Sequence, residues 1–279
     1  MQCDADGNVG TALETCKGGC RAGVCVDTCA VNDVELVYLV DDFDGLYSFN
    51  PRKLPADPFR RIGKLACDTT STPNSMAVDR SGIAWIGYQN GTVHRASILD
   101  AHCLKNSSRP RGAPSRFGMG FVTDGPGSTT EKLFVAGPDN AAKLATLSTE
   151  EAPIAWNEIA PLSKREADNP ELTGTGDGKL FAYFPAPGRG FVQQIERSTG
   201  KLVGTKWKLA GDEGEGVHAY AFAHWGGVFY VFTTIGDNSA VHAIHMDDGR
   251  QELVKEHLPY TIVGAGVSTC APLLEHVPE

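Results

Sequence analysis

The stretch that decides the fold runs from residue 73 to residue 98 and reads PNSMAVDRSGIAWIGYQNGTVHRASI. It divides into three short apolar segments, SMAVD, IAWIGY and TVHRASI, which are separated by DRSG and QNG. Each separator places a Gly where a tight hairpin needs a positive φ angle, and Asn90-Gly91 is the strongest two-residue hairpin signal in the chain. The stretch therefore predicts three antiparallel strands joined by two tight turns.

The rest of the chain repeats this unit. One aromatic residue marks the middle of each second strand, and the spacings between successive markers are 47, 49, 47 and 49 residues. The markers are Tyr38, Trp85, Phe134, Phe181 and Tyr230. A period of about 40 to 50 residues is typical of one four-stranded blade of a β-propeller. The five markers therefore predict five blades.

The two ends of the chain are expected to share one blade. The segment 262–270 reads as a first strand with no second strand after it, whereas VELVYLV near the N-terminus is a second strand with no first strand before it. Pairing them closes the ring and removes the exposed edges of an open array. We therefore predict an all-β, five-bladed propeller over residues 34–279, preceded by a Cys-rich, disulfide-bonded segment over residues 1–33.

The composition agrees with this fold and excludes several function classes. The 279 residues include 32 Gly and 16 Pro, as many short strands and turns require. The net charge is −9, so no basic stripe is expected to neutralise nucleic-acid phosphates or to hold the protein on anionic lipids. No apolar run approaches the length of a membrane span. We expect a monomer with no nucleic-acid partner and no membrane-spanning segment.

The cysteines indicate an oxidising compartment. Five of the eight lie within the first 29 residues, namely Cys3, Cys16, Cys20, Cys25 and Cys29. An even count with a dense cluster is typical of a disulfide framework. A zinc site is the weaker alternative, because the spacing C-x12-C-x3-C-x4-C-x3-C lacks C-x2-C pairs and no His lies nearby.

Partners for the remaining cysteines can be suggested from the predicted blades. Cys67 and Cys103 bracket the blade around Trp85 and could be joined, and Cys270 is a natural partner for one of the five N-terminal cysteines. We expect a secreted or cell-surface protein, with Met1 standing in place of a removed secretion signal. In the alternative, Cys3 carries the lipid anchor of a bacterial lipoprotein.

One blade resembles known propeller families. The pattern D-x-x-G-x-x-W, formed by Asp79, Gly82 and Trp85, resembles blades of the virginiamycin-B-lyase, gluconolactonase and NHL-repeat propellers. The Cys-rich leader followed by this blade looks like secreted or lipoprotein propellers of myxobacteria. The resemblance implies a propeller fold and, for the lyase and lactonase relatives, a divalent metal near the central channel. That metal-binding set has no residue-by-residue match in this sequence.

Candidate site residues are sought where propellers usually bind ligands. The loops before the first strands share one face with the hairpins between second and third strands. On that face we expect the ligand-binding residues Asn74, Glu171, Glu213, Glu215, His218 and Trp225. The glycines of GDEGEGVH (211–218) would let backbone approach a ligand, and His218 could act as a general base. A solvated acidic loop and a structural histidine are the alternatives.

Smaller motifs carry further expectations. The hairpin DDFDG could hold Ca²⁺ through Asp41, Asp42 and Asp44, although it lacks the D-x-D-x-D-G ladder of an EF-hand and a solvated turn is the alternative. Asp79 is expected to cap its own DRSG turn rather than to act in catalysis. His94, which alternates with apolar residues, is expected to point outward.

Three function classes stay open on the sequence alone. The first is a non-enzymatic binding module that recognises a carbohydrate or protein on its acidic loop face, with aromatic residues such as Trp225 flanked by amides. The second is a metal-dependent lyase or lactone hydrolase with Glu171, Glu213, Glu215 or His218 near the channel. The third is an envelope scaffold. No G-x-S-x-G, H-E-x-x-H or P-loop pattern occurs, which favours binding over catalysis.

Overall fold

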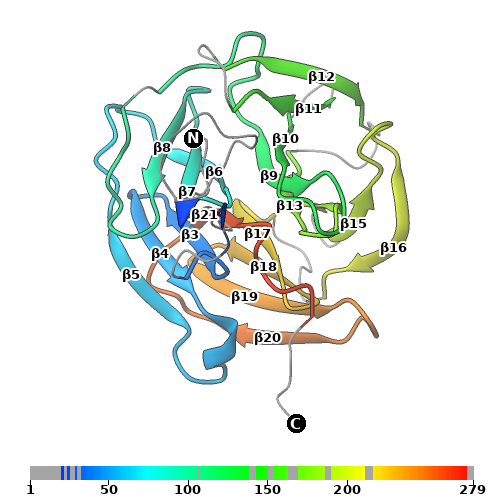
Figure 1. Ribbon diagram of the computed structural model, residues 1–279. Helices are drawn as coiled ribbons and strands as arrows, with labels where there is room; N and C mark the ends of the chain where they lie inside the picture. Colours follow the sequence, from blue (N-terminus) through cyan, green and yellow to red (C-terminus); the bar gives the residue numbers. More distant parts are fainter. Residues whose placement is uncertain are drawn as a thin grey trace.

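Five antiparallel β-sheets surround a central axis in the computed structural model of the chain (Figure 1). The structure describes residues 20–21, 24–25, 29, 33–105, 107–137, 143–149, 154–162, 169–185, 190–210 and 216–274. The sheets are the blades of a propeller, so the fold that the repeat predicts is confirmed. In the described part of the chain, helix is limited to 3-10 turns such as η2 (Pro51–Lys53).

The blades are numbered from the one that the chain ends share, and their strands run from the centre outward. Blade 1 contains β21 (Ile262–Val267), β3 (Val37–Asp41), β4 (Gly45–Phe49) and β5 (Phe59–Lys64). Blade 2 contains β6 (Pro73–Val78), β7 (Ile83–Tyr88) and β8 (Val93–Ser97). Blade 3 contains β9 (Gly118–Thr123), β10 (Glu131–Ala136), β11 (Lys143–Leu147) and β12 (Trp156–Pro161). Blade 4 contains β13 (Glu171–Gly174), β14 (Leu180–Phe184), β15 (Phe191–Ile195) and β16 (Leu202–Lys208). Blade 5 contains β17 (Ala219–Trp225), β18 (Val228–Ile235), β19 (Asn238–His245) and β20 (Gln251–Lys255).

The five aromatic markers all lie in second strands, namely β3, β7, β10, β14 and β18. Closure of the ring is also confirmed, because β21 pairs with β3 in antiparallel register and Ala265 lies opposite Leu39. Near the N-terminus, β1 (Cys20–Arg21) and β2 (Val24–Cys25) form a two-stranded hairpin. A disulfide joins Cys29 to Cys270, three residues beyond the end of β21, so the expected pairing of Cys270 with the N-terminal cluster is confirmed.

Blade 2 has a hydrogen-bonded segment in place of a fourth strand. The amide of Val93 donates to the carbonyl of Ser108 at 2.9 Å, and that of Leu104 donates to the carbonyl of Arg95 at 2.7 Å. The disulfide Cys67–Cys103, which was also expected, ties this segment to the loop before β6. The segment covers the edge of β8. The two disulfides are compatible with an extracytoplasmic location.

The prediction that His94 points outward is wrong. Its side chain is 3% exposed and packs edge-on against Tyr88, with ring centroids 4.9 Å apart. Burial lowers the pKa of His94 and keeps the ring neutral. Alternation with apolar residues predicts an exposed position only where that face of the strand meets solvent, and the face of β8 that carries His94 and Ala96 is buried.

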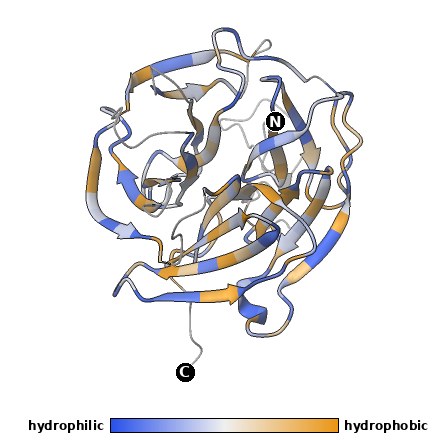
Figure 2. Ribbon diagram, turned by 180° about the vertical axis from the view of Figure 1, so that it is seen from behind, coloured by the Kyte–Doolittle hydropathy of each residue, from blue (hydrophilic) through white to orange (hydrophobic). Residues whose placement is uncertain are grey.

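The apolar core lies between neighbouring blades, and the outer strands β5 and β16 mix exposed with half-buried residues. Hydrophobic and hydrophilic residues are interspersed along the strands (Figure 2). The inner strands approach each other more closely than side chains allow. A Cβ atom at Gly174 would lie 2.1 Å from the carbonyl oxygen of Phe121, and one at Gly118 would lie 2.1 Å from that of Pro170. Both contacts join β13 to β9. Glycine is therefore required where the backbones meet at the channel.

The geometry of the DRSG turn explains the D-x-x-G-x-x-W pattern. Asp79 Oδ1 accepts from the amides of Ser81 at 2.9 Å and Ile83 at 3.0 Å, and Oδ2 accepts from the indole N–H of Trp85 at 3.0 Å. Gly82 has a φ of 76°, as the hairpin requires. The expectation that Asp79 caps its own turn is confirmed.

Candidate functional site

A polar cavity of about 100 Å³ opens at the centre of the ring. We call this side the upper face; it carries the residues that precede the inner strands and the hairpins between second and third strands. All five inner strands, or the residues just before them, contribute to the lining, together with the β7–β8 hairpin. The polar lining residues are Asn74, Gln89, Arg116, Asn169, Glu171, His218 and Tyr220. The cavity is therefore the upper mouth of the propeller channel.

Three of the predicted ligand-binding residues meet in this cavity: Asn74, Glu171 and His218. They lie in blades 2, 4 and 5, so the propeller alone brings them together. Their binding role stays a prediction, but their shared position follows from the period, since each stands at the start of an inner strand.

Glu171 is the most deeply buried polar residue of the cavity. It is the first residue of β13 and is 3% exposed, and the hydroxyl of Ser75 donates to its Oε2 at 2.9 Å. Burial raises the pKa of Glu171 well above its usual range, and the hydrogen bonds from Ser75 and the backbone only partly oppose this. The carboxyl group therefore favours its neutral, hydrogen-bond-donating form.

Asn169 and Tyr220 form one wall. The Tyr220 hydroxyl donates to the backbone carbonyl of Asn169 at 2.8 Å, and Asn169 adopts a left-handed φ of 50°. The side-chain Oδ1 of Asn169 is buried and has no hydrogen-bond partner among the described residues. Buried polar atoms are almost always paired, so this unpaired acceptor in the cavity wall is an exception.

His218 is exposed at the rim, and its backbone amide donates to the carbonyl of Thr234 at 3.1 Å. Asp42, in the β3–β4 hairpin of the neighbouring blade, lies close enough to interact with it. Burial raises the pKa of Asp42, and the charge of His218 partly opposes that rise. Asp42 thus lies beside the mouth, although it does not line the cavity itself.

The aspartates proposed for Ca²⁺ hold their own hairpin. Asp41 Oδ1 accepts from the amides of Phe43 at 2.9 Å and Gly45 at 2.6 Å, while Oδ2 accepts from the Tyr47 hydroxyl at 2.9 Å. Asp44 accepts a long hydrogen bond of 3.4 Å from Tyr88. Within the described ranges, no three His, Cys, Asp or Glu side chains are grouped to hold a metal ion. A Ca²⁺ site stays a prediction.

Trp225 does not lie at the mouth. It is 1% exposed at the opposite end of β17 from His218, and its indole N–H donates to the carbonyl of Glu35 at 2.8 Å. The Arg52 guanidinium stacks on its ring at 4.9 Å. Trp225 therefore packs blade 5 against the segment before β3. Glu213 and Glu215, the other predicted ligand-binding residues, lie outside the described residues.

The sequence-based prediction missed Gln89, Arg116 and Asn169. Each stands at a position equivalent to a predicted one: Arg116 and Asn169 precede inner strands, and Gln89 lies in a hairpin between second and third strands. The repeat could therefore have found them. The sequence-based prediction consists mainly of carboxylates, whereas amides and a guanidinium make up four of the seven polar lining residues. The expected acidic character of the face therefore does not extend into the cavity.

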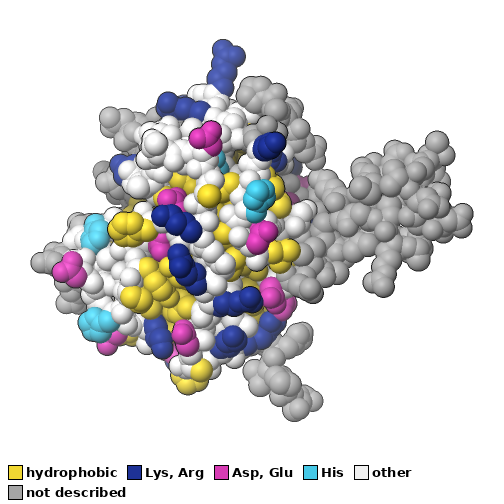
Figure 3. Space-filling model, turned by 90° about the vertical axis from the view of Figure 1, so that its left-hand side faces the viewer, with side chains coloured by type: hydrophobic (Ala, Val, Ile, Leu, Met, Phe, Trp, Pro, Cys, Tyr) yellow, Lys and Arg dark blue, Asp and Glu magenta, His cyan; other side chains and the backbone are white. Residues whose placement is uncertain are grey.

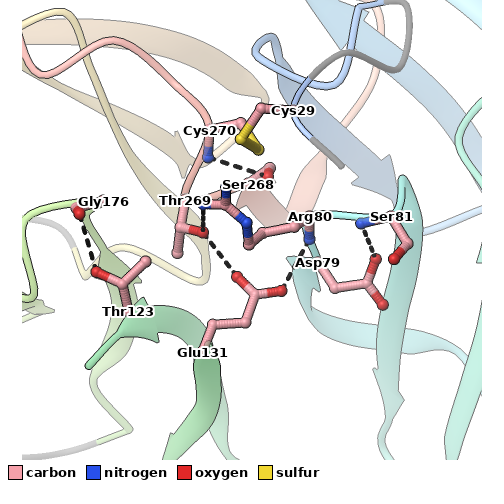
Figure 4. Close-up of a disulfide and its surroundings, with 10 residues drawn as sticks. All are labelled: Cys29, Asp79, Arg80, Ser81, Thr123, Glu131, Gly176, Ser268, Thr269 and Cys270. Carbon is pink, nitrogen blue, oxygen red and sulfur yellow. Dashed lines mark hydrogen bonds between the residues drawn. A yellow bond between two sulfur atoms is a disulfide. The ribbon is translucent and has the colours of Figure 1, made fainter. Parts of the chain in front are cut away.

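A second polar cluster lies at the opposite end of the inner strands from the cavity (Figure 4). The Glu131 carboxylate accepts from the backbone amide of Arg80 at 2.8 Å and from the Thr269 hydroxyl at 2.7 Å. The Arg80 guanidinium also donates to the Thr269 hydroxyl at 3.3 Å, and Cys270 follows directly. The cluster joins blades 1, 2 and 3 beside the Cys29–Cys270 disulfide, which indicates a structural role.

Glu131 should make stability depend on pH. Burial raises its pKa from 4.5 to about 7, so the folded state binds more protons than the unfolded state between these values. The free energy of unfolding should therefore fall as pH rises from 4.5 to 7, by about 3 kcal/mol from this residue alone. Burial lowers the pKa of His224 to about 4, so this residue makes the free energy of unfolding rise as pH rises from 4 to 6.5.

Comparing the wild type with Glu131→Gln isolates this effect, because His224 is present in both proteins. Urea unfolding at pH 4.5, 6 and 8 should show the variant gaining stability relative to the wild type as pH rises. A difference that stays constant over this range would mean that Glu131 titrates normally in the folded protein.

The chain has no match among protein-family models and none among curated proteins. Three solved structures resemble it in fold. A protein of unknown function from Bacteroides caccae has 12% identity and a TM-score of 0.44, over 81% of this chain and 73% of its own. The propeller of Dos1 has 10% identity and a TM-score of 0.41, over 85% of this chain and 71% of its own. The extracellular domain of a protein assigned as a hybrid two-component system from Bacteroides thetaiotaomicron has 10% identity and a TM-score of 0.42, over 82% of this chain and 29% of its own.

Those similarities say nothing of a ligand or an activity. The fold class stands on the sheet topology of this chain itself, and the function has to be argued from the cavity. No helix in the described part of the chain is long and apolar enough to cross a bilayer.

Proposed function

We propose that this protein is an extracytoplasmic, non-enzymatic binding module that holds a carbohydrate at the upper mouth of its channel. The observation that carries the proposal is the convergence of amide, guanidinium, imidazole and carboxyl side chains from four of the five blades on one small cavity. Side chains that both donate and accept hydrogen bonds suit a ligand rich in hydroxyl groups. In this proposal the Asn169 side chain turns its unpartnered Oδ1, which is buried in the free protein, toward such a hydroxyl.

The size of the cavity favours a sugar over a protein surface. The cavity volume of about 100 Å³ is the space open to the centre of a water-sized sphere, and one water molecule needs roughly 10 to 15 Å³ of it. The cavity therefore admits a group of the size of one sugar unit. An exposed aromatic side chain stands on the neighbouring hairpin, since Phe43 is 75% exposed next to Asp42. An exposed ring on this hairpin offers a surface on which a further sugar unit of the same ligand can stack.

The location that fits this proposal is secreted or cell-surface, and a lipid anchor at Cys3 stays a hypothesis. A metal-dependent lyase or lactone hydrolase, which the resemblance of the blade motif implies, stays the alternative function.

Thermal melts after EDTA treatment, with and without added Ca²⁺, test the ion site predicted at Asp41, Asp42 and Asp44. An ion that binds only to the folded state raises the melting temperature.

The proposal predicts that Asn74→Ala weakens carbohydrate binding at least tenfold. Losing one amide hydrogen bond to a ligand costs about 1.5 kcal/mol, which corresponds to a factor of about 10 in Kd. The experiment is a screen of neutral, acidic and amino-sugar oligosaccharides, followed by calorimetry on the tightest ligand. Asn157→Ala is the matched control, because Asn157 is an exposed amide on the outer strand β12.

The expected result is tight binding by the wild type and by Asn157→Ala, with a clear loss for Asn74→Ala. If no oligosaccharide binds, or if the two variants bind alike, the carbohydrate proposal is wrong.

A further inference from the structure

The charged lining residues of the cavity are few and are not predominantly negative. The lining includes Arg116, His218 and Glu171, and no other Asp, Glu, Lys or Arg among the described residues. The chain as a whole carries a net charge of −9. Basic and acidic side chains are interspersed over the side of the ring that Figure 3 faces. The positive charge of Arg116 at the mouth thus contrasts with the negative net charge of the whole chain.

Arg116 is held at the mouth by its neighbours in the chain. The next residue, Phe117, is 3% exposed and packs edge-on against Trp156, with ring centroids 5.5 Å apart. Gly118 then brings β9 into backbone contact with Pro170 and Glu171 at the start of β13. The anchored backbone leaves the exposed Arg116 side chain at the rim of the cavity.

Arg116 also lies between the other polar groups of the cavity. The strand that begins two residues after it, β9, contacts β6 on one side and β13 on the other. Asn74 lines the cavity from β6, and Glu171 lines it from β13. A ligand group bound by the guanidinium would therefore have an amide on one side and a carboxyl group on the other.

The one carboxyl group among the described lining residues is buried and already hydrogen-bonded. Glu171 is buried against Ser75 and the strand backbone, and its raised pKa favours the neutral acid. A neutral acid can donate a hydrogen bond to an anion, which a carboxylate cannot. Outside the lining, the Asp41 carboxylate is bound within its own hairpin, and Asp42 lies beside His218.

We propose that the cavity selects a sugar that carries a carboxylate, such as a uronic acid, over its neutral counterpart. The Arg116 guanidinium binds the carboxylate, for which its planar fork of N–H donors is suited. Asn74, Asn169 and the Glu171 acid bind the hydroxyl groups. This inference rests on the proposed carbohydrate function and adds the class of sugar.

Pairs of methyl glycosides that differ only at C6 test the selectivity. The probes are methyl glucuronide with methyl glucoside, and methyl galacturonide with methyl galactoside, with affinities measured by calorimetry at 50 mM and 300 mM NaCl. At least one uronide should bind tenfold more tightly than its neutral partner, and salt should weaken the uronide alone. Arg116→Gln should reduce the preference below threefold.

Arg111→Gln is the matched control, because Arg111 is an exposed arginine in the same connection and does not line the cavity. It should keep the preference of the wild type, and thermal melts should show that both variants fold. Equal affinity for uronide and neutral glycoside, or an unchanged preference in Arg116→Gln, would overturn the acidic-sugar inference and leave the carbohydrate function standing. If no glycoside and no oligosaccharide binds, both proposals are wrong.

Discussion

Replacing Cys29 and Cys270 by Ala should lower the free energy of unfolding by about 5 kcal/mol. A disulfide stabilises mainly by reducing the conformational entropy of the unfolded chain, and the effect grows with the logarithm of the loop length. This bond joins residues 241 positions apart, which closes almost the whole propeller into one loop. It also anchors the end of β21, the strand that completes blade 1 and therefore the ring.

The Cys67–Cys103 disulfide offers an internal comparison. Its separation is 36 residues, and the same dependence on loop length gives about 4 kcal/mol for Cys67→Ala with Cys103→Ala. Urea unfolding of the two double variants, measured without reductant, should rank the Cys29–Cys270 pair as the larger loss by about 1 to 2 kcal/mol. The opposite ranking would show that anchoring of blade 2, rather than loop closure across the ring, dominates.

The sequence was sufficient to predict the architecture because propeller blades repeat at a fixed period. Each marker, from Tyr38 to Tyr230, falls in a second strand, so the positions of the first and third strands follow by counting. Closure follows as well, since a first strand without a partner at one end matches a second strand without a partner at the other. These features depend only on local patterns, namely short apolar segments and Gly-containing turns, which recur along the whole sequence.

The site was predicted only in part, because a period gives the position of a residue but not its surroundings. Asn74, Glu171 and His218 meet at the mouth as their positions predict. Trp225 stands at the far end of its strand, where the segment before β3 covers it. His94 is buried and packs against the ring of Tyr88 from the neighbouring strand, which its own sequence context does not indicate. Contacts between segments far apart in the sequence decide such cases.

The inner strands of the propeller are predicted to tolerate no side chain at Gly174. A Cβ atom there would lie 2.1 Å from the carbonyl oxygen of Phe121 and 2.5 Å from Cγ2 of Val122. The first of these contacts is with backbone in a paired strand, which cannot move without breaking hydrogen bonds to β10. Gly174→Ala should therefore cost about 3 kcal/mol or more, at the upper end of overpacking effects in cores.

The matched control is Gly125→Ala, because a Cβ at Gly125 meets nothing within 4 Å and no left-handed φ is involved. In thermal melts, Gly174→Ala should lower the melting temperature by roughly 6 to 12 °C, whereas Gly125→Ala should leave it within about 2 °C. A similar small shift for both variants would mean that β9 and β13 can separate. Separation would widen the channel below Glu171, and the cavity at the upper mouth would then lack the rigid base on which its polar groups are positioned.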